Sequence, residues 1–205
     1  LCPDMTIVLN FSVDGLEEEH NRIRGGKDTF RKTLETFHHM KKRKADFPNL
    51  RTGFVTTFTA TNQDHIEDLY EFLRDQGPDS IAINLIRGTP KDPLVKNIDL
   101  EKFKKVTNRV KRDLADARLP GYDEFVAALG FNKYDMVIKT YEEQAFQSIC
   151  YASQIAGVIY PNGDVYPCEL LDKSKMIGNL RDFGFNFRDL WFSNRNKEIA
   201  RWIVD

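Results

Sequence analysis

Short apolar segments rich in β-branched residues alternate with amphipathic segments over the first half of the chain. Three segments have the composition of β-strands, and they are Met5–Val13, Gly53–Ala60 and Ser80–Ile86. The helical patterns between and after them begin at candidate N-cap residues, which are Asp28, Asn62 and Asp99. Because strands that alternate with helices at this interval form βαβ units, the sequence predicts an α/β fold with a parallel sheet.

The predicted strands are apolar on one face and polar on the other. The polar residues gather toward the carboxyl ends of the strands, and they are Asn10, Ser12, Asp14, Thr57, Thr59 and Asn84. A parallel sheet covered on both faces would be apolar nearly throughout. The pattern therefore favours a TIM-like barrel whose lumen opens on a ligand. A sheet face turned to solvent is the alternative interpretation.

The pattern changes after Leu119–Gly121. Helical stretches interrupted by Gly130 come next, and two apolar runs then flank the turn Pro161–Asp164. Asn-Gly between apolar runs is a strong signal for a β-hairpin. The tail Phe187–Val204 has a helical pattern. The sequence thus predicts a small hairpin-plus-helix segment behind the α/β part.

Composition excludes several classes of protein. The 205 residues carry a net charge of −1, whereas a general nucleic-acid binder has a basic excess. No apolar run approaches the roughly 20 residues that span a bilayer, and the first residues do not resemble a signal peptide. Three cysteines (Cys2, Cys150 and Cys168) are too few for a disulfide framework. We therefore expect a cytoplasmic protein that binds neither nucleic acid nor membrane.

Ser12 and Asp14 stand where the first strand ends and a turn begins. Ligand contacts in parallel α/β folds gather at this position, and a hydroxyl with a carboxylate can bind a ribose diol. Arg24 follows in a predicted loop and can bind a carboxylate or phosphate bidentately. The alternative is that Ser12 and Asp14 only shape the turn and that Arg24 is solvated.

Cys150 and Cys168 flank the predicted hairpin in the pattern Cys-x12-Gly-x4-Cys. The hairpin can bring both sulfurs toward one end. Two thiolates are half of the ligand set that zinc or an iron–sulfur cluster needs. Two inert core thiols are the alternative.

Together these motifs resemble those of radical S-adenosylmethionine (SAM) enzymes with a SPASM or twitch C-terminal extension. Ser12–Gly15 followed by His20–Gly25 is similar to the Ser-x-Asp-Gly and His-x-x-x-Arg-Gly segments of that family. The resemblance implies that Ser12 contacts the ribose of S-adenosylmethionine and that Arg24 contacts its carboxylate. It also implies that Asp14 braces the turn.

The C-terminal part resembles the same family. The resemblance implies that Cys150 and Cys168 ligate an auxiliary [4Fe–4S] cluster. Ile177–Leu180 and Leu190–Trp191 are also similar to the extension. On this basis residues 1–120 are expected to be part of the radical SAM barrel, and residues 121–205 linker helices and the start of the SPASM/twitch segment.

The sequence departs from the family at its defining motif. Cys-x3-Cys-x2-Cys, which holds the catalytic cluster, is absent from the 205 residues. The Gly-Gly-Glu-type strand end that grips the amino group of S-adenosylmethionine is also absent. We therefore expect an internal piece, the C-terminal half of a partial (β/α)6 TIM-like barrel with strands four to six, that is inactive alone.

The resemblance implies that the complete protein is an oxidoreductase. Such an enzyme reduces S-adenosylmethionine with one electron from a donor such as flavodoxin or ferredoxin and forms a 5′-deoxyadenosyl radical. The implied substrate is a peptide or protein, and a small molecule remains an alternative. The competing hypothesis is a non-catalytic, barrel-derived binding module, which draws on the aromatic tail residues Phe185, Phe187, Trp191 and Phe192. For that tail we favour helix packing onto the hairpin.

Overall fold

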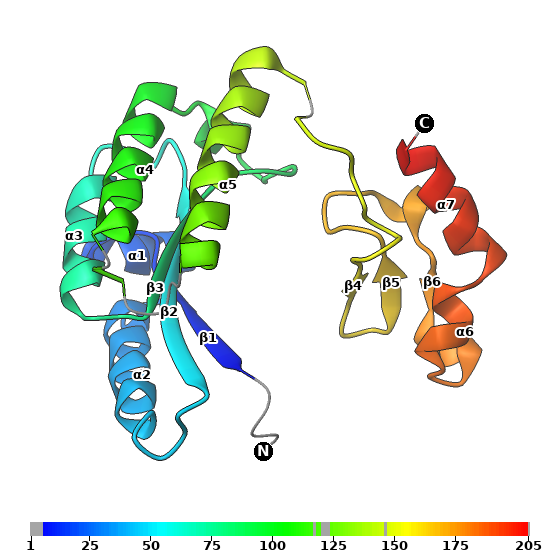
Figure 1. Ribbon diagram of the computed structural model, residues 1–205, viewed down its shortest axis with the longest axis horizontal. Helices are drawn as coiled ribbons and strands as arrows, with labels where there is room; N and C mark the ends of the chain where they lie inside the picture. Colours follow the sequence, from blue (N-terminus) through cyan, green and yellow to red (C-terminus); the bar gives the residue numbers. More distant parts are fainter. Residues whose placement is uncertain (1–5, 117, 120–123, 146, 205) are drawn as a thin grey trace. The chain divides into compact units, whose positions relative to one another are not determined.

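A three-stranded parallel sheet forms the centre of the first part of the molecule (Figure 1). The structure is a computed structural model that describes residues 6–116, 118–119, 124–145 and 147–204, without the side chains of 124–129. Cys2 and Pro120-Gly121 lie outside these residues. The strands pair in the order β1-β2-β3, and their bounds are Ile7–Ser12, Leu50–Phe58 and Ser80–Leu85. The predicted α/β fold with a parallel sheet is confirmed.

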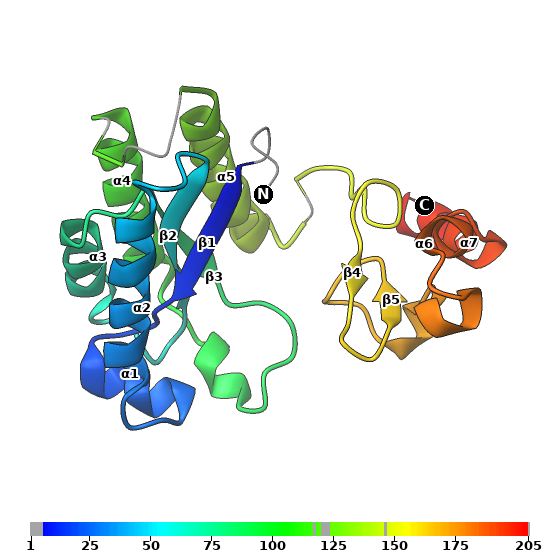
Figure 2. The same ribbon diagram turned by 90° about the horizontal axis from the view of Figure 1, so that it is seen from below.

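Helices cover one face of this sheet and its β3 edge, as both views of the ribbon show (Figure 2). The helical segments of this part are α1 (Glu17–Arg24), α2 (Thr29–Arg43), α3 (Ile66–Asp75), the 3-10 turn η1 (Pro93–Lys96), α4 (Leu100–Ala115) and α5 (Glu124–Glu143). The apolar stripes of α2, α3 and α4 meet the apolar strand face in one core. Phe37 and Phe54 mark its centre, with ring centroids 4.3 Å apart.

The predicted alternation of the strands is present. In β1 the side chains alternate between half-buried and exposed, with Ser12 on the exposed side. In β3 Ile81 and Ile83 are buried on the helix side, and Asn84 is half-buried on the other. On the face opposite the core, Asn10, Ser12, Thr57 and Asn84 lie toward the carboxyl ends of their strands. Lys133 of α5 donates to Oδ1 of Asn84 at 2.7 Å.

The first loop is better organised than the sequence suggested. Arg24 ends α1 rather than lying in a loop, and Gly25 follows it in the left-handed region with φ 69°. Asp28 precedes α2 but makes no side-chain cap bond. Asn21 performs this function, because its Oδ1 accepts hydrogen bonds from the Thr29 hydroxyl (2.7 Å) and from the Phe30 amide (3.0 Å).

Two further expectations about helices are corrected. Asn62 is not the cap of α3, since His65 precedes that helix and makes no side-chain cap bond. Gly130 does not interrupt a helix, because α5 continues through it. The Asp99 cap is confirmed by its bonds from the Glu101 and Lys102 amides.

Helix α5 closes the free edge of β3. It packs beside α4, and the hydroxyl of its buried Tyr134 accepts a hydrogen bond from the Ile83 amide at 3.2 Å. An otherwise unpaired strand amide is thereby satisfied. By packing, the chain divides into the compact units Leu1–Gln144 and Ala145–Asp205. The expected family boundary at residue 120 stays a prediction.

The second unit is built on the predicted hairpin. Strands β4 (Val158–Ile159), β5 (Asp164–Tyr166) and β6 (Gly178–Asn179) form an antiparallel sheet. The other elements are η2 (Lys173–Lys175), η3 (Leu180–Phe183), α6 (Phe187–Trp191) and α7 (Asn194–Val204). A small core holds the hairpin to both helices, and it consists of Val165, Ile177, Leu190 and Ile199.

The aromatic tail packs only in part as expected. Trp191 contacts the small core and stacks on Phe187 with centroids 5.3 Å apart. Phe185 and Phe192 are 70% and 62% exposed, so the packing expected for them is wrong. No helix in the described part of the chain is long and apolar enough to cross a membrane.

Candidate functional site

The carboxyl end of β1 brings the three predicted binding residues together. Ser12 is the last residue of the strand and is exposed. The chain then continues beside β2, since the Val13 amide donates to the Val55 carbonyl at 3.0 Å. This extension carries Asp14 into the protein, where it is 5% exposed.

Asp14 uses all of its polar groups in this position. Its Oδ1 accepts from the Thr57 amide at 2.9 Å, and its Oδ2 pairs with the Arg24 guanidinium at 2.5 Å. Its amide donates to Nδ1 of His20 at 3.2 Å, and its carbonyl accepts from Asn62 at 2.7 Å. A residue held from four sides has little freedom to move. Asp14 therefore joins the end of β1 to α1 and to the end of β2.

Arg24 approaches Asp14 from the last turn of α1. Its side chain is 41% exposed, whereas that of Asp14 is 7% exposed. A guanidinium has five N–H donors, and one ion pair leaves several of them for a ligand. The ion pair with Asp14 thus fixes one nitrogen of the Arg24 guanidinium, and the rest of the cation lies at the carboxyl end of β1.

Two hollows meet at Arg24. One has a volume of about 580 Å³ and is lined by residues of β1, α1 and α2, among them Ser12, His20 and Lys32. The other, of about 690 Å³, is lined by Asp14, Arg24, Asn62 and residues from the end of β2 and the loop after β3. Ser12 and Arg24 line the first hollow together, and their assignment as binding residues stays a prediction. Both volumes lie in the range of small-ligand sites.

Two residues of this site were missed. His20 is 1% exposed, and burial lowers its pKa below the ordinary value. The sequence places it in a motif with Arg24 but assigns it no partner. Asn62, fully buried, was interpreted as a helix cap, although it ties strand ends together.

The second candidate feature is the hairpin with its two thiols. Gly163 lies in the turn with φ 92°, and an added Cβ would lie 2.9 Å from Oδ1 of Asn179. The glycine of the Cys-x12-Gly-x4-Cys pattern is therefore required both by backbone conformation and by close packing. Its amide donates to the Tyr160 carbonyl at 2.8 Å, which closes the predicted turn.

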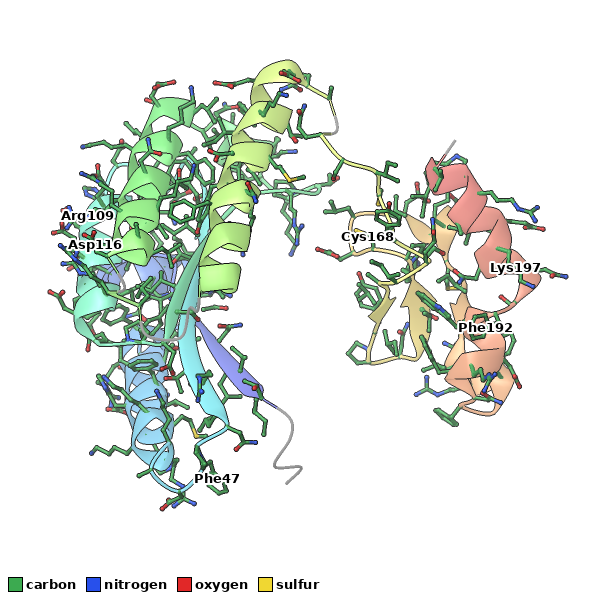
Figure 3. All side chains as sticks on the ribbon, viewed as in Figure 1. Phe47, Arg109, Asp116, Cys168, Phe192 and Lys197 are labelled. Atoms are coloured by element: carbon green, nitrogen blue, oxygen red, sulfur yellow. The ribbon has the colours of Figure 1, made fainter. Side chains whose placement is uncertain are left out.

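Cys168 lies just beyond β5 (Figure 3) and is half-buried. Its Sγ accepts a hydrogen bond from the Leu170 amide at 3.5 Å. The Cys168 thiol in turn donates to Oε2 of Glu169 at 3.5 Å. Cys150 is exposed. Among the described residues no group of three or more His, Cys, Asp or Glu is placed to hold a metal ion, and the assignment of the two thiols as cluster ligands stays a prediction.

Comparison with known proteins yields a family match and a fold match. Residues 150–203 match the SPASM family, an iron–sulfur cluster-binding domain. Protein MJ0907 of Methanocaldococcus jannaschii, whose function is uncharacterized, is 25% identical over 181 residues, which cover 87% of this chain and 54% of that protein.

The fold is similar to that of anSMEcpe with bound AdoMet. The native form gives a TM-score of 0.58 at 15% identity, and a histidine-tagged form gives 0.60 at 16%. Each comparison covers 97% of this chain, and 53% and 51% of the respective structure. The chain therefore spans about half the length of these relatives. The family match confirms the predicted resemblance of the C-terminal part to SPASM, and the solved structures show that the fold is similar.

Proposed function

We propose that this chain is part of a radical SAM oxidoreductase, in which it supplies S-adenosylmethionine-binding residues and two ligands of an auxiliary [4Fe–4S] cluster. One observation carries the proposal. Ser12, Asp14 and Arg24, which are separated in the sequence, converge at the carboxyl end of β1. They do so in a chain whose C-terminal part matches an iron–sulfur cluster-binding family.

The residues present fit S-adenosylmethionine. The exposed Ser12 hydroxyl would bind a ribose oxygen, and the free donors of Arg24 would bind the carboxylate. Asp14 would hold the Arg24 guanidinium in place rather than contact the ligand, because its oxygens are occupied. The hollow that Ser12 and Arg24 share is large enough to take part of such a molecule.

The thiols fit half of a cluster. An iron–sulfur cluster takes four ligands, and Cys150 and Cys168 supply two. When bound, the iron–sulfur centres of the complete protein would supply electrons for the reductive cleavage of S-adenosylmethionine. The residues of this chain would bind and orient the reacting molecules.

The sheet also fits a partial barrel. Its three strands run parallel in sequential order, and the face opposite its core carries polar residues toward the carboxyl ends. These are the properties of consecutive strands whose second face lines a lumen. We assign the strands as four to six of a (β/α)6 barrel.

A peptide or protein is the proposed substrate. Structures of anSMEcpe with bound AdoMet and a peptide have the same fold, with TM-scores of 0.54 and 0.53. The lumen beside Arg24 would take the reacting residue of the substrate. The electron would come from a protein donor such as flavodoxin or ferredoxin, in the cytoplasm, where the thiols stay reduced.

Anaerobic reconstitution of the complete protein tests this function. It should bind iron and sulfide and convert S-adenosylmethionine to 5′-deoxyadenosine. Arg24→Met should raise the dissociation constant for S-adenosylmethionine about tenfold, because a charge-assisted pair is lost. Arg31→Met is the matched control, since Arg31 is exposed on α2 and pairs with Glu35. Absence of both iron and 5′-deoxyadenosine would sink the proposal.

The exposed side chains of Phe185 and Phe192 favour a second candidate, the non-catalytic binding module. A module would capture a partner without iron, and its binding would be lost in Phe192→Ser. The same preparation separates the two candidates, because only the enzyme releases 5′-deoxyadenosine.

A further inference from the structure

His20 is a buried polar residue beside the proposed binding site. It lies on the inner side of α1 and is 1% exposed. Its ring meets the Phe30 ring edge-on with centroids 5.8 Å apart. It also lines the hollow that Ser12 and Arg24 line. A polar ring in this place needs defined hydrogen-bond partners.

The protonation state of His20 follows from its geometry. Nδ1 accepts the Asp14 amide at 3.2 Å, so Nδ1 carries no proton. The ring is therefore neutral with its proton on Nε2. Burial agrees with this assignment, because it is the largest effect on the pKa of His20 and lowers it below the ordinary value. The charge of Asp14 raises this pKa by less, and the charge of Arg24 lowers it further.

Of the four groups that hold Asp14, His20 is the one whose contact disappears on protonation, which takes place below its ordinary pKa of about 6.5. The Thr57 amide and the Asn62 carboxamide do not titrate there, and Arg24 keeps its charge. Protonated His20 would turn an N–H donor toward the Asp14 amide, which is also a donor. Protonation therefore removes the acceptor of the Asp14 amide and leaves the other three contacts of Asp14 in place.

We propose that neutral His20 is a positioning residue of the S-adenosylmethionine site, which acts through the main chain of Asp14 to align Arg24 with Ser12. This inference rests on the proposed function. The charged groups that act on the ring are Asp14, which follows β1, and Arg24 of α1, and Lys32 of α2 lines the same hollow. The site weakens as His20 gains a proton, and it is intact when the ring is neutral.

The variants His20→Asn and His20→Phe separate positioning from packing. The carboxamide oxygen of asparagine can replace Nδ1 as the acceptor, whereas phenylalanine keeps the ring and removes the acceptor. At about pH 7.5 we expect His20→Phe to bind S-adenosylmethionine about tenfold more weakly than the wild type, and His20→Asn to recover most of this loss. His39→Phe, on the exposed side of α2, is the control.

The pH profile is a readout that packing alone would not change. The pKa of His20 in the folded protein lies below its ordinary value of about 6.5. The contribution of the His20–Asp14 contact to S-adenosylmethionine binding is therefore complete above about pH 6.5, and it is lost as the pH falls through the pKa of the folded protein. Wild-type binding should weaken over this range more than that of His20→Asn, which cannot titrate. Equal pH profiles, or unchanged binding by His20→Phe, would overturn the inference.

Hydrogen exchange of the Asp14 amide in the complete protein, followed by NMR, tests the contact without S-adenosylmethionine. The amide should be protected in the wild type and in His20→Asn, and should exchange at least about tenfold faster in His20→Phe. Protection without S-adenosylmethionine binding would sink the proposed function but support the His20–Asp14 contact. An unprotected wild-type amide would refute the contact itself.

Discussion

At the scale of single residues, Asn62 joins three chain segments through one carboxamide. Its Nδ2 donates to the carbonyls of Asp14 (2.7 Å) and Thr57 (2.9 Å), and its Oδ1 accepts from the Thr59 amide at 2.9 Å. The side chain is fully buried. Its removal would leave main-chain groups without partners in a place that water does not reach easily.

Replacement of Asn62 by alanine should therefore be costly. We expect Asn62→Ala to lower the free energy of unfolding by about 2–3 kcal/mol, because buried donors and acceptors lose their partners. Urea denaturation followed by far-UV circular dichroism measures this change. Asn132→Ala, at an exposed position on α5, should stay within about 0.5 kcal/mol of the wild type. Equal losses in both variants would contradict the role of Asn62.

The predictability of each residue depends on where its partners lie. Ser12 and Asp14 could be placed at a strand end from local pattern alone, because a strand and its turn are contiguous. Asn62 lies 48 residues from Asp14, and only the parallel pairing of β1 with β2 brings them together. Its preference for capping positions gave a plausible but wrong local interpretation.

At the scale of elements, Asp79 joins α2, β2 and the start of β3. It is 5% exposed, and its Oδ1 pairs with Lys44 at 2.6 Å. Its Oδ2 accepts from the Thr52 amide at 2.8 Å. Burial raises its pKa, but the bonds from Lys44 and Thr52 together outweigh burial, and the pKa of Asp79 lies below its ordinary value.

This pKa predicts how the sheet responds to acid. A carboxyl group with a lowered folded pKa stabilises the protein above its unfolded pKa of about 3.9, and the contribution is lost as the pH falls through the folded value. Asp79→Asn should be less stable than the wild type near neutral pH but should lose less stability between about pH 5 and pH 2. Urea denaturation across this range measures the difference. Parallel stability curves would argue against the assignment.

The hairpin depends on Gly163. Alanine at this position must adopt φ near 92°, and its Cβ would lie 2.6 Å from the Arg181 guanidinium. We expect Gly163→Ala to destabilise the second unit by about 1–3 kcal/mol. Both tryptophans of the chain, Trp191 and Trp202, lie in that unit, so tryptophan fluorescence reports its unfolding.

Gly130→Ala is the control for this variant. Gly130 lies inside α5, and an added Cβ would meet Leu114 at an ordinary 3.4 Å. Alanine also favours the helix, so this variant should be neutral or slightly stabilising, and should leave the fluorescence transition unchanged. If the fluorescence transition of Gly163→Ala lay at the same urea concentration as that of the wild type, the turn would tolerate a side chain at this position.

The sequence pattern predicted the hairpin of the second unit more accurately than its helices. Asn-Gly between apolar runs located the turn, because this dipeptide suits the required backbone conformation. The single tail helix expected over Phe187–Val204 is two helices, α6 and α7, with a break at Phe192-Ser193. Periodicity alone could not show that break, since both helices place apolar residues in one core.

At the scale of the whole molecule, the residues that the structure describes form two cores that share no residue. The larger core lies between the parallel sheet and its helices, and the smaller one lies between the hairpin and α6 and α7. The change of pattern after Leu119 revealed two parts. It could not show that α5 belongs to the first, because Tyr134 reaches β3 across 51 residues.

Separate cores predict separate unfolding. The second unit has only 61 residues, from Ala145 to Asp205, and a core of four fully buried apolar side chains. A core of this size supplies little stability, because small domains bury a smaller fraction of their surface. We expect tryptophan fluorescence to report a transition at lower urea concentration than far-UV circular dichroism, which the long helices α2, α4 and α5 dominate.

The variants already described make this test specific to each unit. Gly163→Ala should move only the fluorescence transition, and Asn62→Ala only the transition seen by circular dichroism, because the mutated residues belong to different cores. Two-state unfolding would instead give coincident transitions by both probes. Coincident curves that both variants shift together would show that the two cores unfold as one, and that the second unit depends on the first for its stability.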